Sequence, residues 1–306
     1  MKIATLVVTY NRKKLLKECL YSILNQSIIS DNIFVIDNAS NDGTQELFEI
    51  NGLFYNSKIT YIRENYNLGG AGGFYKGIKA CYKDYDWIWI MDDDTIPTKK
   101  CLEGLIDCVN IFKDEKISFI ASSIWGPNGE AMNLPTIDLD PFSNGYSNWY
   151  LHLGKGLVKI KTATFVSILI NTKAIEKCGL PQSWYFIWGD DTEYTLRLTK
   201  NFGPAFFTGN SVAIHKRYNA KQLSIWDENN INRINLYFYF FRNHLLNTKK
   251  YYGKKEAIIY MIKLQLLCLK KIFNNNIKYR FKKIRIINKA IRAYLFHNYE
   301  EKQIDE

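Results

Sequence analysis

Short apolar runs alternate with segments of helical periodicity over the first 120 residues, and this alternation limits the possible folds more than any other feature. The runs IATLVVTY, NIFVID, KITYIREN and DWIWIM are predicted strands. Between them, Lys13–Leu24 has apolar residues at helical steps, and residues 44–50 and 73–82 also suit helices. Because strands that alternate with helices build βαβ units, the sequence predicts an α/β fold with a mostly parallel central sheet flanked by helices.

The rest of the chain adds further α/β elements and then changes character. Residues 125–155 are rich in Gly, Pro and Asn and form a predicted loop region. TATFVSILI is a predicted strand, residues 191–200 a predicted helix, and SVAIH a late strand that ends at His215. We expect an α/β domain over residues 1–220 and a helical, basic, amphipathic C-terminal region over residues 221–306.

The formal net charge of +11 is concentrated near the C-terminus. Residues 249–292 carry 14 Lys and Arg against one acid, Glu256, a net charge of +13, so the rest of the chain sums to −2. Apolar residues recur among these charges at helical steps. Such a segment can be a solvated cap, a nucleic-acid-binding surface or a helix on an anionic membrane. No nucleic-acid-binding module is visible, so we expect no nucleic-acid partner, and the membrane surface and the plain cap both stay open at this point.

Composition and cysteine spacing place the chain among ordinary globular proteins. Hydrophobic residues make up 47% of it, enough for a sizeable core. The six cysteines form neither a C-x-x-C pair nor a zinc-binding pattern, so we expect buried thiols in a reducing cytosol. The N-terminal apolar run is too short for a signal peptide, and no stretch reaches the ~18 apolar residues of a membrane span. These features predict a cytoplasmic protein.

The segment WIWIMDDDT puts three carboxylates directly after a predicted strand. In an extended chain, Asp92 and Asp94 point one way and Asp93 the other. Adjacent carboxylates repel one another unless a cation lies between them, and paired oxygen ligands suit Mg²⁺ or Mn²⁺ bound to a diphosphate. A solvated acidic turn is the alternative. The position at the ligand-binding edge of a parallel sheet favours the metal.

Two further segments and one histidine are candidates for binding or catalysis. NYNLGGAGGF has four glycines in five positions, which predicts a flexible loop that approaches a phosphate before a helix begins. In WYFIWGDDTEYTLR, Asp190 and Asp191 open a predicted helix, where a carboxylate can act as a general base or only cap the helix. The preceding aromatic residues can stack on sugars or lie in the core. His215, at a strand end, is the distant ligand that an acidic metal site would need.

These segments resemble the family 2 glycosyltransferases, which have the GT-A nucleotide-sugar-binding fold. VVTYNRKKLLKECLYSILNQS and FVIDNASNDGT are similar to the opening of that family. NLGGAGGF, WIWIMDDDT, WGDDTEY, AIHK and FFRN resemble the bacterial galactofuranosyltransferases most. The related rhamnosyltransferases share the opening but usually have another acidic triplet and a single later carboxylate. The resemblance covers roughly residues 1–245.

The resemblance implies a role for each candidate residue. The residues that would line the uridine pocket are Thr9, Asn11, Arg12 and Asp37. Asn67 and the adjacent glycines Gly69 and Gly70 would meet the ribose or diphosphate. Asp92 and Asp93, in the acidic triplet, are the other residues expected to bind the donor. The implied ligands of Mn²⁺ or Mg²⁺ are Asp92, Asp94 and His215. Asp191 would be the catalytic base, and Asp190 would orient the acceptor. Gly189 stands where the family has a Trp, with Trp188 one position earlier, which alters the expected stacking of the acceptor.

The implied reaction is an inverting, metal-dependent transfer of galactofuranose from UDP-galactofuranose to a hydroxyl of a growing cell-surface glycan. A polyprenyl-diphosphate-linked acceptor at the inner face of the cell membrane would explain the basic tail, and would make the protein peripheral there. A donor of dTDP-rhamnose or another nucleotide hexose is the enzymatic alternative. The non-enzymatic alternative is a membrane-associated glycan-binding scaffold, against which the complete set of acidic residues and His215 argues.

Overall fold

The computed structural model describes residues 1–49, 52, 54–112, 115–217 and 221–297. The chain forms two compact units. The first comprises Met1–Pro181 and Asp191–Ala220, and the second comprises Gln182–Asp190 and Lys221–Glu306. The domain boundary that the sequence suggests after residue 220 stays a prediction. In the structure, the short segment Gln182–Asp190 also groups with the C-terminal unit.

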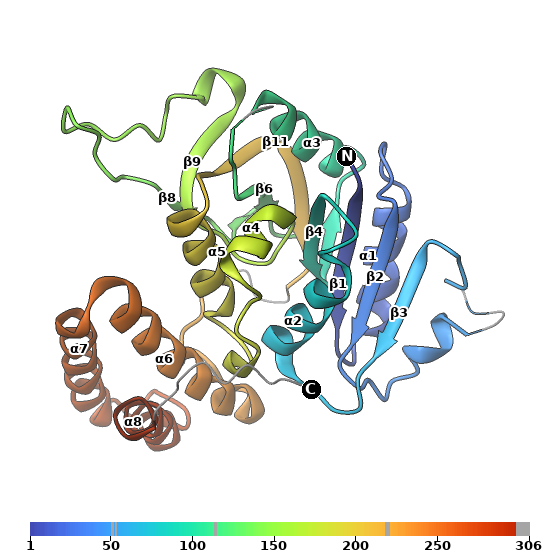
Figure 1. Ribbon diagram of the computed structural model, residues 1–306. Helices are drawn as coiled ribbons and strands as arrows, with labels where there is room; N and C mark the ends of the chain where they lie inside the picture. Colours follow the sequence, from blue (N-terminus) through green and yellow to red (C-terminus); the bar gives the residue numbers. More distant parts are fainter. Residues whose placement is uncertain (50–51, 53, 113–114, 218–220, 298–306) are drawn as a thin grey trace. The chain divides into compact units, whose positions relative to one another are not determined.

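The first unit is built on one sheet with the strand order β3-β2-β1-β4-β10-β6-β11-β9-β8 (Figure 1). The first four strands in this order run parallel to one another: β3 (Ile59–Arg63), β2 (Asn32–Asp37), β1 (Ile3–Thr9) and β4 (Trp87–Asp92). Beyond β4 the sheet is mixed. There β10 (Ile168–Asn171) runs antiparallel to both β4 and β6 (Phe119–Trp125), and β11 (Ala205–His215) runs parallel to β6.

Helices and short strands complete the first unit around this sheet. The helices are α1 (Lys13–Leu24), α2 (Gly69–Cys81), α3 (Cys101–Ile111), α4 (Thr172–Cys178) and α5 (Asp190–Asn201), with 3₁₀ turns η1 (Gln45–Leu47) and η2 (Leu153–Lys155). The remaining strands are β5 (Thr95–Pro97), β7 (Ala131–Met132), β8 (Thr136–Ile137) and β9 (Leu157–Thr162). The predicted α/β class, with helices flanking a central sheet, is confirmed.

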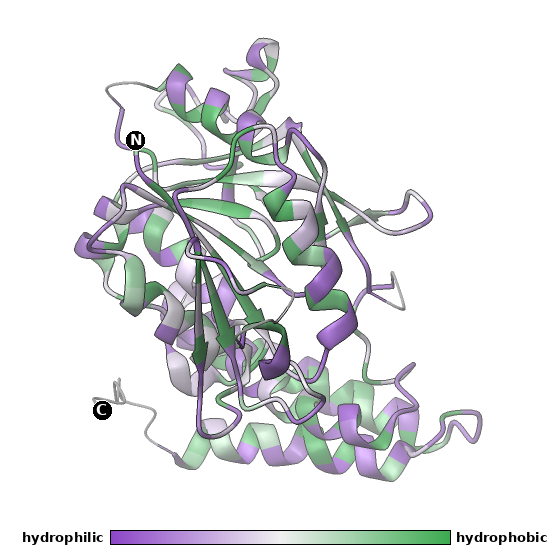
Figure 2. Cartoon of the chain, turned by 90° about the vertical axis from the view of Figure 1, so that its right-hand side faces the viewer, coloured by the Kyte–Doolittle hydropathy of each residue, from purple (hydrophilic) through white to green (hydrophobic). Residues whose placement is uncertain are grey.

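Both faces of the sheet are covered, which explains why β1 reads as a continuous apolar run rather than an alternating one. All seven residues of β1 are buried. Val7 packs with Leu16 of α1 and Trp89 of β4 on one face, whereas Leu6 packs with Ile78 of α2 on the other. The strands are correspondingly green in Figure 2.

The glycine-rich segment is not a loop that precedes a helix, as the sequence suggested. Helix α2 already begins at Gly69, so most of the glycines lie in its first turns. A Cβ atom on Gly73 would lie 2.4 Å from Cγ1 of Val8, and one on Gly77 would lie 2.3 Å from Cδ1 of Leu6. The glycines therefore let α2 approach β1 closely, and this packing outweighs their low helix propensity.

Two other local predictions were wrong in extent. The predicted strand TATFVSILI is extended only at Thr162 and from Ile168 onward, because Ser167 has a φ of +56° and interrupts the run. Phe165, between these strands, contacts the rings of Phe74 and Tyr194 instead. The predicted helix over residues 44–50 is only the 3₁₀ turn Gln45–Leu47, and residue 50 lies outside the described residues.

The second unit is a helical bundle with its own core. Its elements are the 3₁₀ turn η3 (Ser183–Tyr185) and the helices α6 (Ile231–Tyr252), α7 (Lys254–Ile272) and α8 (Arg280–Phe296). Phe241 and Leu245 of α6 pack with Leu264 of α7 and Ile287 of α8. Within the described residues, none of the helices combines the length and apolar character that crossing a bilayer requires.

Candidate active site

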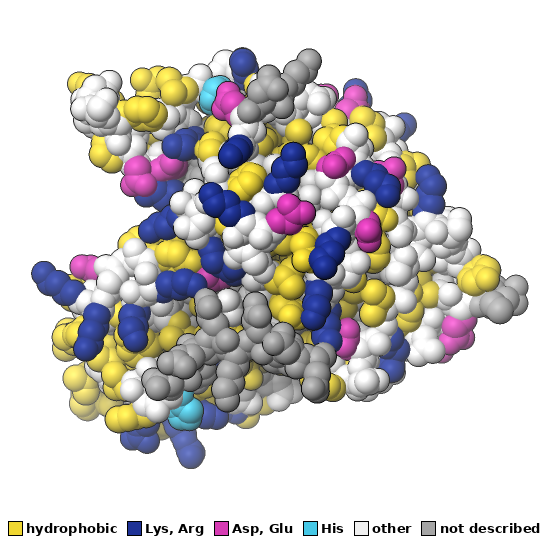
Figure 3. Space-filling model, viewed as in Figure 1, with side chains coloured by type: hydrophobic (Ala, Val, Ile, Leu, Met, Phe, Trp, Pro, Cys, Tyr) yellow, Lys and Arg dark blue, Asp and Glu magenta, His cyan; other side chains and the backbone are white. Residues whose placement is uncertain are grey.

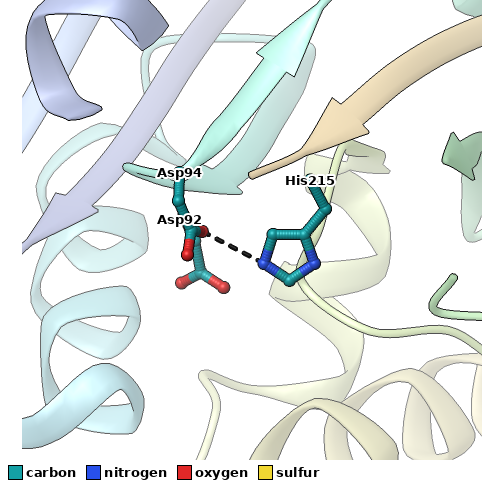
Figure 4. A group of neighbouring side chains, drawn as sticks. All are labelled: Asp92, Asp94 and His215. Carbon is teal, nitrogen blue, oxygen red and sulfur yellow. Dashed lines mark ion pairs between the residues drawn. The ribbon is translucent and has the colours of Figure 1, made fainter. Parts of the chain in front are cut away.

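The acidic triplet lies where β4 ends and the chain turns into β5. Asp92 is the last residue of β4, and Asp94 directly precedes β5. Because β5 pairs with β11 in a register that sets Thr95 opposite His215, the histidine comes to lie beside Asp94. Ligand atoms of Asp92, Asp94 and His215 all lie within 4.8 Å of one another (Figure 4). The structure thus brings together the three predicted metal ligands from positions far apart in the sequence.

The chemistry of this group fits a divalent cation. Asp94 and His215 are buried, and Oδ1 of Asp94 lies 3.1 Å from Nε2 of His215. That oxygen accepts no well-aligned hydrogen bond from any described residue. Burial alone would raise the pKa of Asp94, but His215 and Arg12 outweigh it and hold this pKa below its usual value. A buried, ionised carboxylate beside an imidazole nitrogen is a ligand set suited to Mn²⁺ or Mg²⁺.

Asp93 is not a member of this group, and its carboxylate contacts Thr9 at the end of β1 and Arg12 in the following loop. Its carboxylate accepts hydrogen bonds from Thr9 Oγ1 at 2.6 Å and from Arg12 Nη1 at 3.1 Å. The same Nη1 of Arg12 lies 2.7 Å from Oδ2 of Asp94. Burial raises the pKa of Asp93 to about 6, although Arg12 offsets part of the effect. Arg12 therefore compensates the charge of two adjacent buried carboxylates and fixes their orientation.

The loops after β1 and β2 hold each other in place. Asn11 has a φ of +53° and donates its backbone N–H to Ser40 Oγ, while its side-chain oxygen accepts from the backbone of Asn41. Asp37 accepts from the hydroxyl of Tyr61 at 2.5 Å and from the backbone N–H of Ser40 at 2.8 Å. Asp37 is thus anchored at the sheet edge where the sequence predicted a uridine pocket.

The start of α2 faces the same edge of the sheet. The side-chain oxygen of Asn67 accepts a hydrogen bond from the backbone N–H of Gly69, which has a φ of +72°. Asn38, at the end of β2, donates to the carbonyl of Gly69 at 2.9 Å. A Cβ atom on Gly70 would meet nothing within 4 Å. Hydrogen bonds with Asn67 and Asn38 therefore fix the backbone of Gly69, and the space beside Gly70 is open.

The paired acids Asp190 and Asp191 begin α5, as predicted, and neither is a member of the metal-ligand group found among the described residues. Asp190 is buried and belongs to the second unit, and Asp191 belongs to the first. Oδ1 of Asp191 accepts a hydrogen bond from the backbone N–H of Thr192 at 2.7 Å. The helix N-terminus favours the ionised form of such carboxylates.

The aromatic segment before these acids is held by side chains of α6, a contact that the sequence did not reveal. Within the second unit, Asn243 Nδ2 lies 3.0, 3.2 and 2.7 Å from the carbonyl oxygens of Tyr185, Ile187 and Trp188. Other donors to this segment are Arg242, which reaches the carbonyls of residues 184 and 185, and Asn247, which reaches that of residue 189.

The ring of Trp188 packs against Tyr237 and Phe240 of α6, within the bundle. The backbone has positive φ angles at Phe186, Trp188 and Gly189. The hydrogen bonds to the carbonyl groups of this segment explain these angles, because they hold the backbone in an irregular conformation. The motif FFRN was noted in the sequence, and its Arg242 and Asn243 supply these contacts.

One residue beside the metal-ligand group was missed altogether. Asn133 lies in the stretch that the sequence showed only as loop, and its Oδ1 is 2.8 Å from Nδ1 of His215. No local pattern marks it, because the contact depends on the pairing of β7 with β6.

The fold places the first unit in a known structural class. S. aureus TarS 1–349, solved in complex with UDP-GlcNAc, aligns with a TM-score of 0.58 over 96% of this chain and 82% of that chain, at 15% identity. GalNAc-T7, solved with UDP, GalNAc and Mn²⁺, aligns with a TM-score of 0.64 over 96% of this chain and 56% of that chain, at 12% identity. At these identities the similarity concerns the fold, which is the predicted GT-A fold.

Sequence comparison agrees with the motifs. Residues 5–151 match Glycosyl transferase family 2, so this part of the chain carries a domain of that family. Galactofuranosyltransferase GlfT1 of Mycolicibacterium smegmatis is 28% identical over 209 residues, which cover 65% of this chain and 66% of the relative.

Two relatives with shorter matches are named for other activities. Abequosyltransferase RfbV of Salmonella typhimurium is 40% identical over 95 residues, 30% of this chain and 28% of the relative. The dTDP-rhamnosyl transferase RfbG of Shigella flexneri is 35% identical over 105 residues, 34% of this chain and 36% of the relative. The chain thus spans just under two thirds of the GlfT1 relative and about a third of these two.

Proposed function

We propose that this protein is an inverting, metal-dependent hexosyltransferase that moves galactofuranose from UDP-galactofuranose to a hydroxyl of a growing cell-surface glycan. The observation that carries the proposal is the convergence of Asp92, Asp94 and His215 at the carboxyl end of β4. The choice of donor is supported by the GlfT1 match, which covers 65% of the chain, whereas the abequosyl and rhamnosyl matches cover 30% and 34%.

In this proposal Asp92, Asp94 and His215 would hold Mn²⁺ or Mg²⁺, and the bound cation would supply positive charge next to the diphosphate of the donor. Two observations support it: the unsatisfied buried oxygen of Asp94 and the ion pairs of Arg12 with the same acidic triplet. Arg12 leaves the triplet with less net negative charge. A divalent cation held by these side chains would balance the remaining negative charge.

The remaining donor contacts follow from the loops that the structure anchors at this sheet edge. We assign the uridine pocket to Thr9, Asn11, Arg12 and Asp37. We assign the ribose and diphosphate contacts to Asn67, Gly69 and Gly70, and we count Asp92 and Asp93 of the acidic triplet among the donor-binding residues. The support is mutual anchoring: these loops are cross-linked by side-chain hydrogen bonds, and such preorganisation reduces the cost of ordering on binding.

Asp191 is the proposed general base and Asp190 the residue that orients the acceptor. The acceptor oxygen forms a bond to the anomeric carbon, the bond from that carbon to the UDP oxygen breaks, and the acceptor proton passes to Asp191. UDP leaves, and a single displacement inverts the configuration. The position of Asp191 at the N-terminus of α5 supports its ionised form at neutral pH.

A panel of nucleotide sugars tests the donor and the reaction together. The purified protein is incubated with UDP-galactofuranose, dTDP-rhamnose and UDP-hexoses, each with a lipid-linked acceptor and with either Mn²⁺ or EDTA. We expect transfer from UDP-galactofuranose in Mn²⁺ only. Transfer from dTDP-rhamnose alone would select the second candidate, which the RfbG match favours. Binding of glycan without turnover of any donor would instead identify a scaffold.

The acceptor in this proposal is linked to polyprenyl diphosphate, and α7 supplies the contact with the membrane. Ile258, Ile262, Leu266, Leu269 and Phe273 are all exposed and follow one another at steps of three or four residues. Because an α-helix rotates by about 100° per residue, these side chains form one apolar stripe along α7. Lys254 lies on one side of it, and Lys263 and Lys270 on the other. Figure 3 shows such basic and apolar side chains together over α7.

An apolar stripe bordered by lysines fits an anionic bilayer surface, since each cation near such a surface contributes about 1 kcal/mol and the apolar side chains insert below the headgroups. We therefore propose a cytoplasmic protein that is peripheral on the inner face of the membrane. Screening acts over about 8 Å at physiological salt, so the attraction should weaken as salt rises.

Vesicle co-sedimentation tests this surface. We expect the wild type to bind vesicles with anionic lipid more tightly than neutral ones, and a variant with Leu266→Glu and Leu269→Glu to remain soluble. The control is Leu139→Glu, at an exposed leucine of the first unit, which should bind like the wild type. Equal binding of both lipids, or none, would leave α7 as a plain helical cap. Salt-sensitive binding to RNA but not to vesicles would make the tail a nucleic-acid surface.

A further inference from the structure

We infer that Asn133 is a positioning residue that fixes the tautomer and orientation of the His215 ring for cation binding. The inference rests on the metal site of the proposed function and names a residue to which no motif points. Asn133 directly follows β7, while His215 ends β11, and the two strands share β6 as a neighbour in the sheet.

The contact is directional. Oδ1 of Asn133 lies 2.8 Å from Nδ1 of His215, and the amide nitrogen of Asn133 lies 3.1 Å from Oγ1 of Thr164. With the amide nitrogen directed to the hydroxyl, the oxygen faces the imidazole. An amide oxygen only accepts hydrogen bonds, so Nδ1 of His215 must carry the proton.

The opposite ring nitrogen is then available as a ligand. With the proton on Nδ1, the neutral imidazole has its lone pair on Nε2, which faces Oδ1 of Asp94 at 3.1 Å. A cation bound beside these two atoms would accept a lone pair from each of them. Metal-binding histidines are usually oriented in this way, by a partner at the other ring nitrogen, and loss of such a partner typically costs about 10- to 100-fold in metal affinity.

The backbone conformation of Asn133 also supports a specific role for this residue. Its φ is +49°, in the left-handed region that most residues avoid and that asparagine tolerates better than most. This conformation allows a well-matched substitution, because Asn133→Gly removes the amide while suiting the backbone. Asn133→Asp keeps an acceptor atom where Oδ1 lies.

The test is Mn²⁺ binding to the metal-free protein, followed by electron paramagnetic resonance, with the ¹⁵N shifts of His215 measured in the same samples. We expect Asn133→Gly to bind Mn²⁺ about 10- to 100-fold more weakly than the wild type and to show a mixture of ring tautomers. Asn133→Asp should bind at least as tightly as the wild type and keep the proton on Nδ1.

Wild-type affinity in a folded Asn133→Gly variant would overturn the inference alone, and so would an Asn133→Asp variant as weak as Asn133→Gly. A wild-type protein that binds no Mn²⁺, with or without UDP, would overturn the metal site of the proposed function and this inference with it. The unfolding temperature of each variant, compared with that of Asn128→Gly in a nearby exposed turn, shows whether a loss reflects the fold instead.

Discussion

Asp191 has two possible roles that one substitution separates. As a helix-capping group it accepts a hydrogen bond from the backbone of Thr192, and an asparagine oxygen can do the same. As a base it must accept a proton, which an amide does not. We expect Asp191→Asn to lower the turnover rate by about 10²- to 10⁴-fold, with UDP affinity and unfolding temperature unchanged. A variant that loses mainly stability would show that Asp191 only caps α5.

Among single residues, the sequence indicated the three side chains that the structure brings together in the candidate site, but not the residues that support them. Asp92, Asp94 and His215 were predicted because acidic residues at a strand end have a limited set of chemical explanations. Asn133 was not predicted, because its role depends on which strand neighbours β6. Likewise, no pattern around Arg12 shows that its guanidinium spans two carboxylates of the triplet.

At the scale of elements, α2 shows how tertiary packing reverses a local prediction. Its glycines suggested a loop, yet they allow the helix to lie against β1. Gly73→Ala should lower the free energy of unfolding by about 1–3 kcal/mol, because the new Cβ would lie 2.4 Å from Val8.

The matched control for this prediction is Gly70→Ala, where the added Cβ meets nothing within 4 Å. It should be neutral or stabilise by up to about 1 kcal/mol, since alanine favours helices. Urea unfolding of both variants measures the difference. Equal effects at the two positions would contradict the close packing of α2 on β1.

The segment before α5 depends on α6 in a similar way. Asn243→Asp replaces a donor that serves backbone carbonyls in the segment 185–188 by a group that only accepts. We expect the free energy of unfolding to fall by about 1–3 kcal/mol for each carbonyl left without a donor. In the control Asn288→Asp, the new carboxylate can still accept from Gln265. Urea unfolding should show no such loss there, and equal losses in the two variants would refute this role of Asn243.

The elements that were predicted well are those in which the spacing of the apolar residues matches the face that the element buries. β1, β2, β4 and α1 were predicted almost to the residue, because each buries one stripe or one continuous run. The predicted strand over residues 162–170 failed at Ser167, whose positive φ no composition rule indicates. The mixed half of the sheet was also not predicted, since strand order does not follow from periodicity.

At the scale of the whole molecule, stability should depend on a buried lysine of the helical unit. Lys283 is fully buried and donates to the carbonyl of Trp226 at 2.8 Å. Burial lowers the pKa of Lys283, and the nearby Asp227 and Glu228 offset part of this effect. Between this lowered pKa and the unfolded value of about 10.4, the unfolded chain binds more protons. The free energy of unfolding contributed by Lys283 therefore rises with pH through that window.

Comparison of the wild type with Lys283→Met isolates this contribution from other titrating groups. Urea unfolding between about pH 7 and pH 10 should give a difference in stability between the two proteins that moves in favour of the wild type as pH rises. At pH 7 the methionine variant should be at least as stable, because an apolar side chain of similar shape avoids burying a charge. A difference that does not change with pH would show that Lys283 keeps its ordinary pKa.

The central claim is that UDP binding depends on a cation held by Asp92, Asp94 and His215. Calorimetric titration of UDP in Mn²⁺ and in EDTA, for the wild type, Asp94→Ala and His215→Ala, tests it most directly. We predict that Mn²⁺ strengthens UDP binding to the wild type and has no such effect on either variant, while both variants remain folded. Equal UDP affinity of the wild type in Mn²⁺ and EDTA, or unchanged affinity in both variants, would contradict the claim.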